Sequence, residues 1–308
     1  MGNDYEAPAI MKLAGAKAWL YLLPAILILL FYVVYPSVRT GYLSFLNQEA
    51  TALASVQCRE GEPCWGIFEN YRRAFSEASV VFRNNGLWIL LMVPGTTVLG
   101  LVIAVLVDRV GYESLAKAVI FLPMAISFVG ASVIWGHMYY YKSEPPQIGL
   151  LNAIVTSLGF EPVPWTTSDP ILATVALVVV GIWMWTGFCM TILSAALKGV
   201  PDELIEAARI DGANEFQIFW QVTVPIILPT IVVVLTTMTI NVLKIFDIVY
   251  VMAKGQPGTQ VIATRMYIEQ FNKGNTGFSS ALAVLLILAV LPVGYINVRR
   301  FREQEKIR

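Results

Sequence analysis

The sequence predicts an all-α membrane protein, a bundle of six transmembrane helices with a helix-turn-helix segment on its cytoplasmic side. The first observation is composition: 57% of the 308 residues are hydrophobic, 14% are charged and the mean hydropathy is +0.66. A water-facing globular surface does not tolerate this composition. The second is that six apolar stretches are long enough to cross about 30 Å of hydrocarbon, which takes about 20 helical residues. The third is one long polar segment between the fourth and fifth stretches.

The six stretches divide residues 1–308 into the spans and loops of one transmembrane domain. Each span must be a helix, because unpaired backbone groups are costly in lipid. Prolines inside the spans are expected to kink the helices rather than end them. These are Pro24, Pro94, Pro123, Pro229 and Pro292. The spans lie near residues 18–35, 86–107, 118–140, 171–197, 225–253 and 278–298, with an outer loop over 38–85 and a cytoplasmic loop over 198–224.

Both termini are predicted to lie on one side, because the number of spans is even. The basic tail over residues 299–308 favours the cytoplasm for that side by the positive-inside rule. The majority is small, since eleven of the 21 basic residues fall on the inner side, nine in outer loops and one, Lys244, in a span. Lys12 and Lys17 precede the first span as in a signal sequence, but no cleavage site follows, so we interpret that span as retained.

Cysteine and histidine are scarce, which limits metal and nucleophile chemistry. Cys58 and Cys64 flank a turn-rich stretch of the outer loop, where a disulfide and two free thiols are equally consistent with the sequence. Cys189 lies in an apolar span and is predicted to be a small packing residue. His137 is the only histidine and stands beside tyrosines at the end of a span. It is interpreted as an interfacial residue, so neither a His-pair metal site nor a Ser-His-Asp triad is expected.

Charge and missing motifs exclude further functions. The 21 basic and 21 acidic residues balance, so no basic field attracts nucleic acid. No P-loop is present, so the chain is not expected to be an enzyme or to hold a cofactor, and any ATP must be hydrolysed by another chain. An ion-coupled secondary carrier is the alternative, although Asp247 alone is thin support for buried acidic groups. A membrane-embedded enzyme would need a catalytic cluster, which is not found.

The polar segment over residues 198–224 carries the signals of two short helices. Pro201 suits a first helical position, and Gly212 suits the left-handed geometry that ends a helix. Asn214 is a good cap for a second helix, which is predicted to run toward Pro225. The segment is therefore expected to form a compact helix-turn-helix.

The same segment carries a motif with a defined spacing. Glu206, Ala207 and Ala208 are followed by Gly212 and, after nine residues, by Val-Thr-Val-Pro at residues 222–225. This motif resembles the EAA loop of ABC importer permeases. The family pattern ends in Ile-x-Leu-Pro, so two valines are conservative exchanges. The resemblance implies that this loop docks on a separate ATP-hydrolysing subunit; an amphipathic helix packed on its own bundle is the other interpretation. The implied ATPase-coupling residues are Glu206, Ala207, Ala208, Asp211 and Gly212.

Other segments extend the resemblance over nearly the whole chain. Residues 68–75 look like an outer-loop signature of the group, and residues 120–124 like the opening of its third span. Residues 246–257 match only in part the segment after the fifth span. Within the binding-protein-dependent sugar importers, residues 125–135 and 242–251 look most like the α-glucoside permeases.

This resemblance implies an assembly in a bacterial inner membrane. The expected partners are a second, similar permease, two ATP-binding subunits that hold ATP and magnesium, and an extracytoplasmic sugar-binding protein. The expected function is import of a carbohydrate, an α-glucoside or another oligosaccharide. Trehalose, maltose and sucrose are the first candidates.

A polar stripe in the fifth span is the candidate translocation path. Thr237, Asn241 and Lys244 are spaced by four and three residues, with Asp247 three further on, so they are expected on one helical face. Such a stripe normally faces the bundle interior or a wet cavity. Lys244 and Asp247 are expected near the outer boundary, where snorkelling or pairing is an equally good interpretation.

Overall fold

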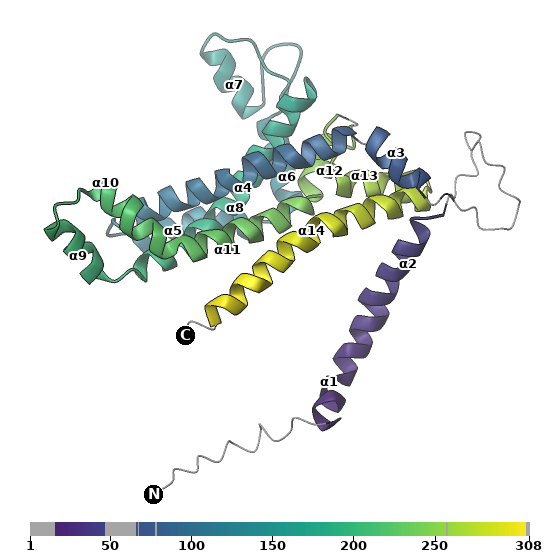
Figure 1. The fold of residues 1–308 in the computed structure, drawn as a ribbon. Helices are drawn as coiled ribbons and strands as arrows, with labels where there is room; N and C mark the ends of the chain where they lie inside the picture. Colours follow the sequence, from purple (N-terminus) through teal and green to yellow (C-terminus); the bar gives the residue numbers. More distant parts are fainter. Residues whose placement is uncertain (1–15, 47–65, 67, 78, 257, 306–308) are drawn as a thin grey trace, which may run out of the picture.

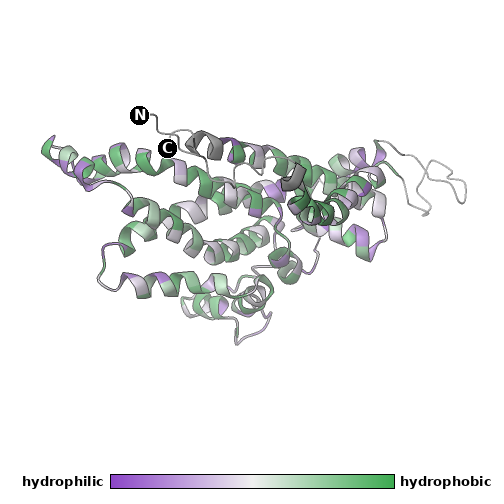
Figure 2. Cartoon of the chain, turned by 90° about the horizontal axis from the view of Figure 1, so that it is seen from below, coloured by the Kyte–Doolittle hydropathy of each residue, from purple (hydrophilic) through white to green (hydrophobic). Residues whose placement is uncertain are grey.

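The computed structural model describes residues 16–46, 66, 68–77, 79–256 and 258–305, and the regular elements among them are helices (Figure 1). Four long helices form the body, and apolar residues run along most of their length (Figure 2). They are α4 (Ser79–Val107), α8 (Pro170–Lys198), α11 (Val224–Leu243) and α14 (Thr276–Glu305). In the described part of the chain, five helices are long and apolar enough to cross a membrane, and a bent pair makes a sixth candidate.

The first predicted span is one long helix that projects from the body (Figure 1). It comprises α1 (Ala16–Leu29), a π-helical turn (Leu30–Val34) and α2 (Tyr35–Leu43), whose last part contacts α14. The end of α2 and the start of α4 extend into the predicted outer loop over 38–85, and α3 (Glu69–Glu77) lies within it. Cys58 and Cys64 lie outside the described residues.

The third predicted span, over 118–140, is not one kinked helix. It consists of α5 (Glu113–Phe121), a 3-10 turn (Leu122–Ala125) and α6 (Phe128–Met138), and the two parts meet at 97°. Pro123 is the second residue of the tight turn, and Ser127 caps α6 by accepting a hydrogen bond from the Gly130 amide at 3.0 Å. The expectation that prolines only kink is wrong here, while the other four lie inside helices.

The fifth predicted span, over 225–253, is also interrupted. Helix α11 ends at Leu243, and α12 (Asp247–Ala253) follows after a short break. The backbone leaves helical geometry at Lys244 and Phe246, whose φ values are −97° and −136°. Helix α12 packs against α6 and α8, so tertiary packing redirects a chain that is apolar enough to continue.

Small residues bring α4 and α8 close together. A Cβ on Gly100 would lie 2.7 Å from the Cβ of Cys189, and one on Gly181 would lie 2.9 Å from the Trp88 ring. Cys189 is fully buried in this contact, which confirms its predicted packing role. This close contact, named the α4–α8 seam, places the two helices at the centre of the body.

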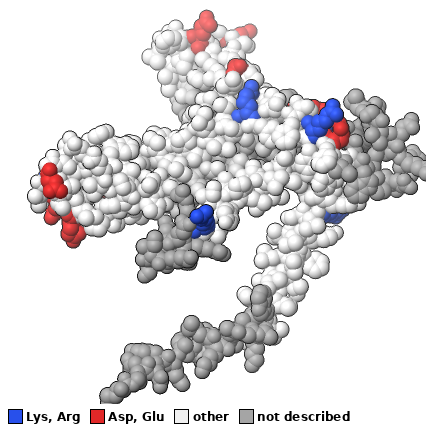
Figure 3. Space-filling model, viewed as in Figure 1, with Lys and Arg blue, Asp and Glu red and all other residues white. Residues whose placement is uncertain are grey.

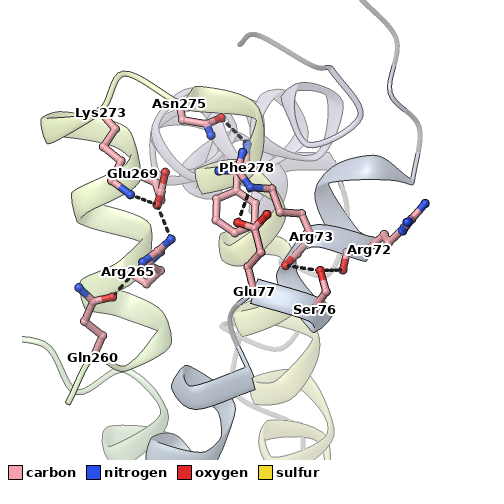
Figure 4. Close-up of polar contacts among 10 residues, drawn as sticks. All are labelled: Arg72, Arg73, Ser76, Glu77, Gln260, Arg265, Glu269, Lys273, Asn275 and Phe278. Carbon is pink, nitrogen blue, oxygen red and sulfur yellow. Dashed lines mark hydrogen bonds and ion pairs between the residues drawn. The ribbon is translucent and has the colours of Figure 1, made fainter. Parts of the chain in front are cut away.

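The ends of the body carry shorter elements. At one end, named the α3 end, α13 (Ile262–Tyr267) and a π-helical turn (Ile268–Asn272) pack beside α3 and the start of α14 (Figure 4). Between α6 and α8, α7 (Leu150–Ser157) projects to the side (Figure 1). At the opposite end, named the α9 end, three elements link α8 to α11: α9 (Asp202–Ile210), α10 (Glu215–Ile218) and a π-helical turn (Phe219–Thr223).

Candidate functional site

The segment over residues 199–224 forms the tip of the α9 end (Figure 1). Helix α9 lies where the sequence predicts it, although Pro201 occupies the N-cap position rather than the first helical one. Gly212 follows α9 with φ +87°, a conformation that side-chain-bearing residues rarely adopt. The predicted glycine turn is confirmed, and it reverses the chain between the two short helices.

A capping box starts the second short helix. The Gln217 amide donates to Asn214 Oδ1, and the Asn214 amide donates to Gln217 Oε1, both at 2.9 Å. These bonds satisfy amides that a helix start leaves unpaired. From here α10 continues through the π-helical turn into α11, so the tip is joined directly to a long helix of the body.

The side chains of α9 are not packed into the body, because none of its residues is buried. Glu206, Ala207, Asp211 and Gly212 are exposed, and Ala208 is half-buried. Large apolar side chains are exposed beside them: Leu204, Ile210, Phe216 and Trp220. Ile205 and Ala208 are half-buried, and α9 contacts α10 and the π-helical turn after it, so packing on the chain's own elements covers only part of this helix.

Acidic side chains gather over this tip (Figure 3). They are Asp202, Glu203, Glu206, Asp211 and Glu215. Arg209 Nε lies 2.9 Å from Glu215 Oε1, and this carboxylate raises the pKa of Arg209. The tip thus combines acidic groups with exposed apolar side chains, which suits a protein partner that offers basic groups around an apolar cleft.

The predicted polar stripe holds over two of its four members. Thr237 and Asn241 are half-buried one turn apart on α11, and Asn241 Nδ2 donates to the Thr237 carbonyl at 3.0 Å. Lys244 is exposed where α11 ends, and Asp247 begins α12 beyond the break. The single helical face does not extend to Asp247, because the helix has already ended.

A cavity of about 650 Å³ lies between the end of α6, the loop before α8 and α12. None of the four stripe residues lines it. Its polar lining includes His137, residues 139–141, Thr166, Lys254 and Gln256. The run of three tyrosines is visible in the sequence, but only the fold brings it to α12.

Comparison with known proteins gives one consistent family. Residues 85–301 match the family described as "Binding-protein-dependent transport system inner membrane component". The chain is 51% identical over 292 residues to the osmoprotective compounds uptake permease protein GgtC of Synechocystis, covering 94% of this chain and 100% of that protein. It is 46% identical over 289 residues to the alpha-glucoside transport system permease protein AglF of Rhizobium meliloti, covering 92% and 82%.

A solved structure shares the fold. A chain of a bacterial ABC transporter involved in the import of the acidic polysaccharide alginate superposes with a TM-score of 0.74. The identity is 22%, and the match covers 94% of this chain and 99% of that one. The helical architecture described above is therefore shared with a chain of that transporter.

Proposed function

We propose, from the premise that the chain belongs to the family of binding-protein-dependent transport system inner membrane components, that it is the permease of an ATP-driven carbohydrate importer. A permease moves solute without changing it chemically. Because the sequence contains no P-loop, we propose that a partner subunit hydrolyses the ATP that drives transport. The coupling part of the proposal is carried by one observation. This is the exposed acidic tip over residues 199–224, which is joined directly to α8 and α11.

The tip is proposed to dock in a cleft of the ATPase subunit. Ala207 and Ala208 are small enough to permit close approach, and Glu206 is exposed and available to a cationic group. Gly212 makes the turn that keeps α9 and α10 compact. The contact set proposed for coupling is Glu206, Ala207, Ala208, Asp211 and Gly212.

The proposed assembly contains a second, similar permease, two ATP-binding subunits that hold ATP and magnesium, and an extracytoplasmic solute-binding protein. A bacterial alginate ABC transporter with a chain of similar fold was solved in complex with a periplasmic protein that holds an alginate pentasaccharide, which supports the solute-binding protein in this proposal. The proposed location is the cytoplasmic membrane of a bacterium. The last turns of α14 run toward the α9 end, where the tip lies, and we propose that this end faces the cytoplasm (Figure 1).

The proposed solute is a small hydroxyl-rich carbohydrate. The names of the two relatives, an alpha-glucoside permease and an osmoprotective compound permease, favour trehalose, maltose or sucrose. Thr237 and Asn241 are proposed to offer hydrogen bonds along the path, with Lys244 and Asp247 nearer its outer mouth. Cys58 and Cys64 remain a proposed disulfide of the outer loop.

Reversal of charge at Glu206 tests the coupling proposal. In the assembled transporter, Glu206→Lys places a cation where we propose a cationic partner group, so the co-purified ATPase subunit is expected to fall about tenfold or more. The measurement is recovery of ATPase with the affinity-tagged chain, together with solute uptake. Glu161→Lys is the matched control, because Glu161 is exposed in the loop before α8, far along the chain from the tip. Full ATPase recovery and full uptake in Glu206→Lys would refute the docking role.

A further inference from the structure

Five polar side chains from three segments meet at the α9 end, just before the tip begins. Asp108 follows the last residue of α4, and Glu113 begins α5. Ser194 and Lys198 stand one turn apart at the end of α8, and Lys198 is its last residue. The set is named the Asp108 cluster: Asp108, Glu113, Lys117, Ser194 and Lys198.

The contacts form a continuous chain from α4 to α8. Lys117 Nζ lies 2.7 Å from Asp108 Oδ1 and 2.5 Å from Glu113 Oε1, and it also binds Ser194. Ser194 Oγ donates to Asp108 Oδ1 at 2.7 Å. Lys198 Nζ pairs with the same Glu113 oxygen that holds Lys117. The last two turns of α8 are therefore tied to both sides of the α4–α5 turn.

Burial and charge balance make this cluster more than a set of surface pairs. Two carboxylates and two ammonium groups neutralise one another, and Ser194 is 1% exposed. The exposed fractions of the Asp108, Lys117 and Glu113 side chains are 16%, 21% and 28%, and only Lys198 is half exposed, at 52%. Partly buried networks are screened less by solvent than isolated surface pairs, whose contribution is small.

Close backbone contacts also join α4, α5 and α8 farther from the tip than the Asp108 cluster. A Cβ on Gly187 of α8 would lie 2.5 Å from the Ile120 carbonyl oxygen and 2.7 Å from the Phe121 Cα of α5. A Cβ on Gly100 of α4 would likewise lie 2.7 Å from the Cys189 Cβ of α8. Helices α4, α5 and α8 thus make one tightly packed unit, and the Asp108 cluster closes it at the end nearest the tip.

We propose that the Asp108 cluster transmits movement of the tip to the body, with Lys198 and Glu113 as positioning residues. Only residues 199–201 separate Lys198 from α9, so the Lys198–Glu113 pair holds the point where the tip joins α8. A displacement of α9 then moves α4, α5 and α8 together. Without the pair, the last turn of α8 can fray and absorb that displacement. The inference rests on the proposed coupling role of residues 199–224.

The test measures solute transported per ATP hydrolysed by the assembled transporter in proteoliposomes. Lys198→Met and Glu113→Gln are each expected to lower this ratio about fivefold or more, which is the size of a modest coupling between sites. The ATPase subunit should still co-purify, because neither residue belongs to the docking tip. Lys198→Arg keeps the charge and should keep the ratio. The double variant should be no worse than the poorer single one, since both changes break the same link.

Glu77→Gln is the matched control, because it neutralises a carboxylate of an exposed ion pair on α3, at the opposite end of the body. Unchanged transport per ATP in Lys198→Met and Glu113→Gln would overturn the relay. So would loss of the co-purified ATPase, which would make the cluster part of assembly instead. Failure of the proposed coupling role has a different signature: the wild-type chain would recover no ATPase, or Glu206→Lys would transport normally.

Discussion

Glu269 is a fully buried carboxylate at the α3 end. Its Oε1 atom lies 2.9 Å from both Arg265 Nη2 and Lys273 Nζ (Figure 4), while Oε2 has no hydrogen-bond partner among the residues that the structure describes. The flanking side chains differ in exposure, since Arg265 is 18% and Lys273 50% exposed. A buried charge persists only when an opposite charge compensates it, so Glu269 and Arg265 depend on each other.

Removing the charge of Glu269 is expected to destabilise the protein. In Glu269→Gln the mostly buried Arg265 guanidinium loses its counter-charge, and breaking a buried pair typically costs about 3–5 kcal/mol. The half-exposed Lys273 can return to water, so Lys273→Met is expected to cost under about 1 kcal/mol. Thermal unfolding of the purified detergent-solubilised variants measures both. Equal melting temperatures for Glu269→Gln and the wild type would contradict the pairing argument.

At the scale of elements, the α4–α8 seam depends on residues without side chains. A Cβ on Gly100 would lie 2.7 Å from the Cys189 Cβ and 2.9 Å from the Met190 backbone nitrogen. The backbone of α8 cannot yield as a flexible side chain could. Gly86 is on the same helix, but a Cβ there would meet no atom of the described residues within 4 Å.

The two glycines of α4 are therefore expected to respond oppositely to alanine. Gly100→Ala should lower the melting temperature, because overpacking of about 1–3 kcal/mol exceeds the gain in helix propensity of about 1 kcal/mol. Gly86→Ala should raise it slightly, because only the propensity gain remains. Thermal unfolding in one detergent compares them directly. A Gly100→Ala protein as stable as the wild type would show that the seam opens without penalty.

Elements with strong local signals were predictable from the sequence. The positions of α9 and α10 followed from Gly212 and Asn214, because turn and cap geometry is decided within a few residues. The breaks after Phe121 and Leu243 were not predictable, because both stretches are apolar enough to continue as helices. Packing of α12 against α6 and α8 decides the second break, and the hydropathy of the sequence does not predict this packing.

The candidate sites also differ in how far the sequence predicts them. The tip residues are contiguous, so one motif located them. The cavity beside α12 joins residues 132–141, 166–167 and 251–256, which only the fold brings together. The Asp108 cluster likewise joins residues 86 positions apart, such as Asp108 and Ser194, and no local pattern marks such a contact.

At the scale of the whole molecule, the chain is organised as part of a larger assembly. None of the most apolar window of the long helix formed by α1 and α2 is buried within the chain. Helix α9 of the tip likewise has no buried residue. Between these surfaces, α11 offers Thr237 and Asn241 as half-buried polar groups. Solute specificity is therefore best measured in the complete transporter rather than in the isolated chain.

The complete transporter is expected to respond to α-glucosides through Asn241. With its binding protein in proteoliposomes, trehalose, maltose or sucrose should stimulate ATP hydrolysis, and glycerol phosphates should not. Asn241→Ala removes one hydrogen-bonding side chain, worth about 1 kcal/mol, so stimulation should need about fivefold more solute-loaded binding protein. Thr236→Val is the matched control, because it removes a side-chain hydrogen bond to the α11 backbone, as Asn241→Ala does, at a residue outside the proposed stripe. Basal ATP hydrolysis should be the same in both variants, since neither touches the tip.

An unchanged response in Asn241→Ala would show that the solute path does not follow this face of α11. Stimulation by glycerol phosphates alone would contradict the proposed substrate class.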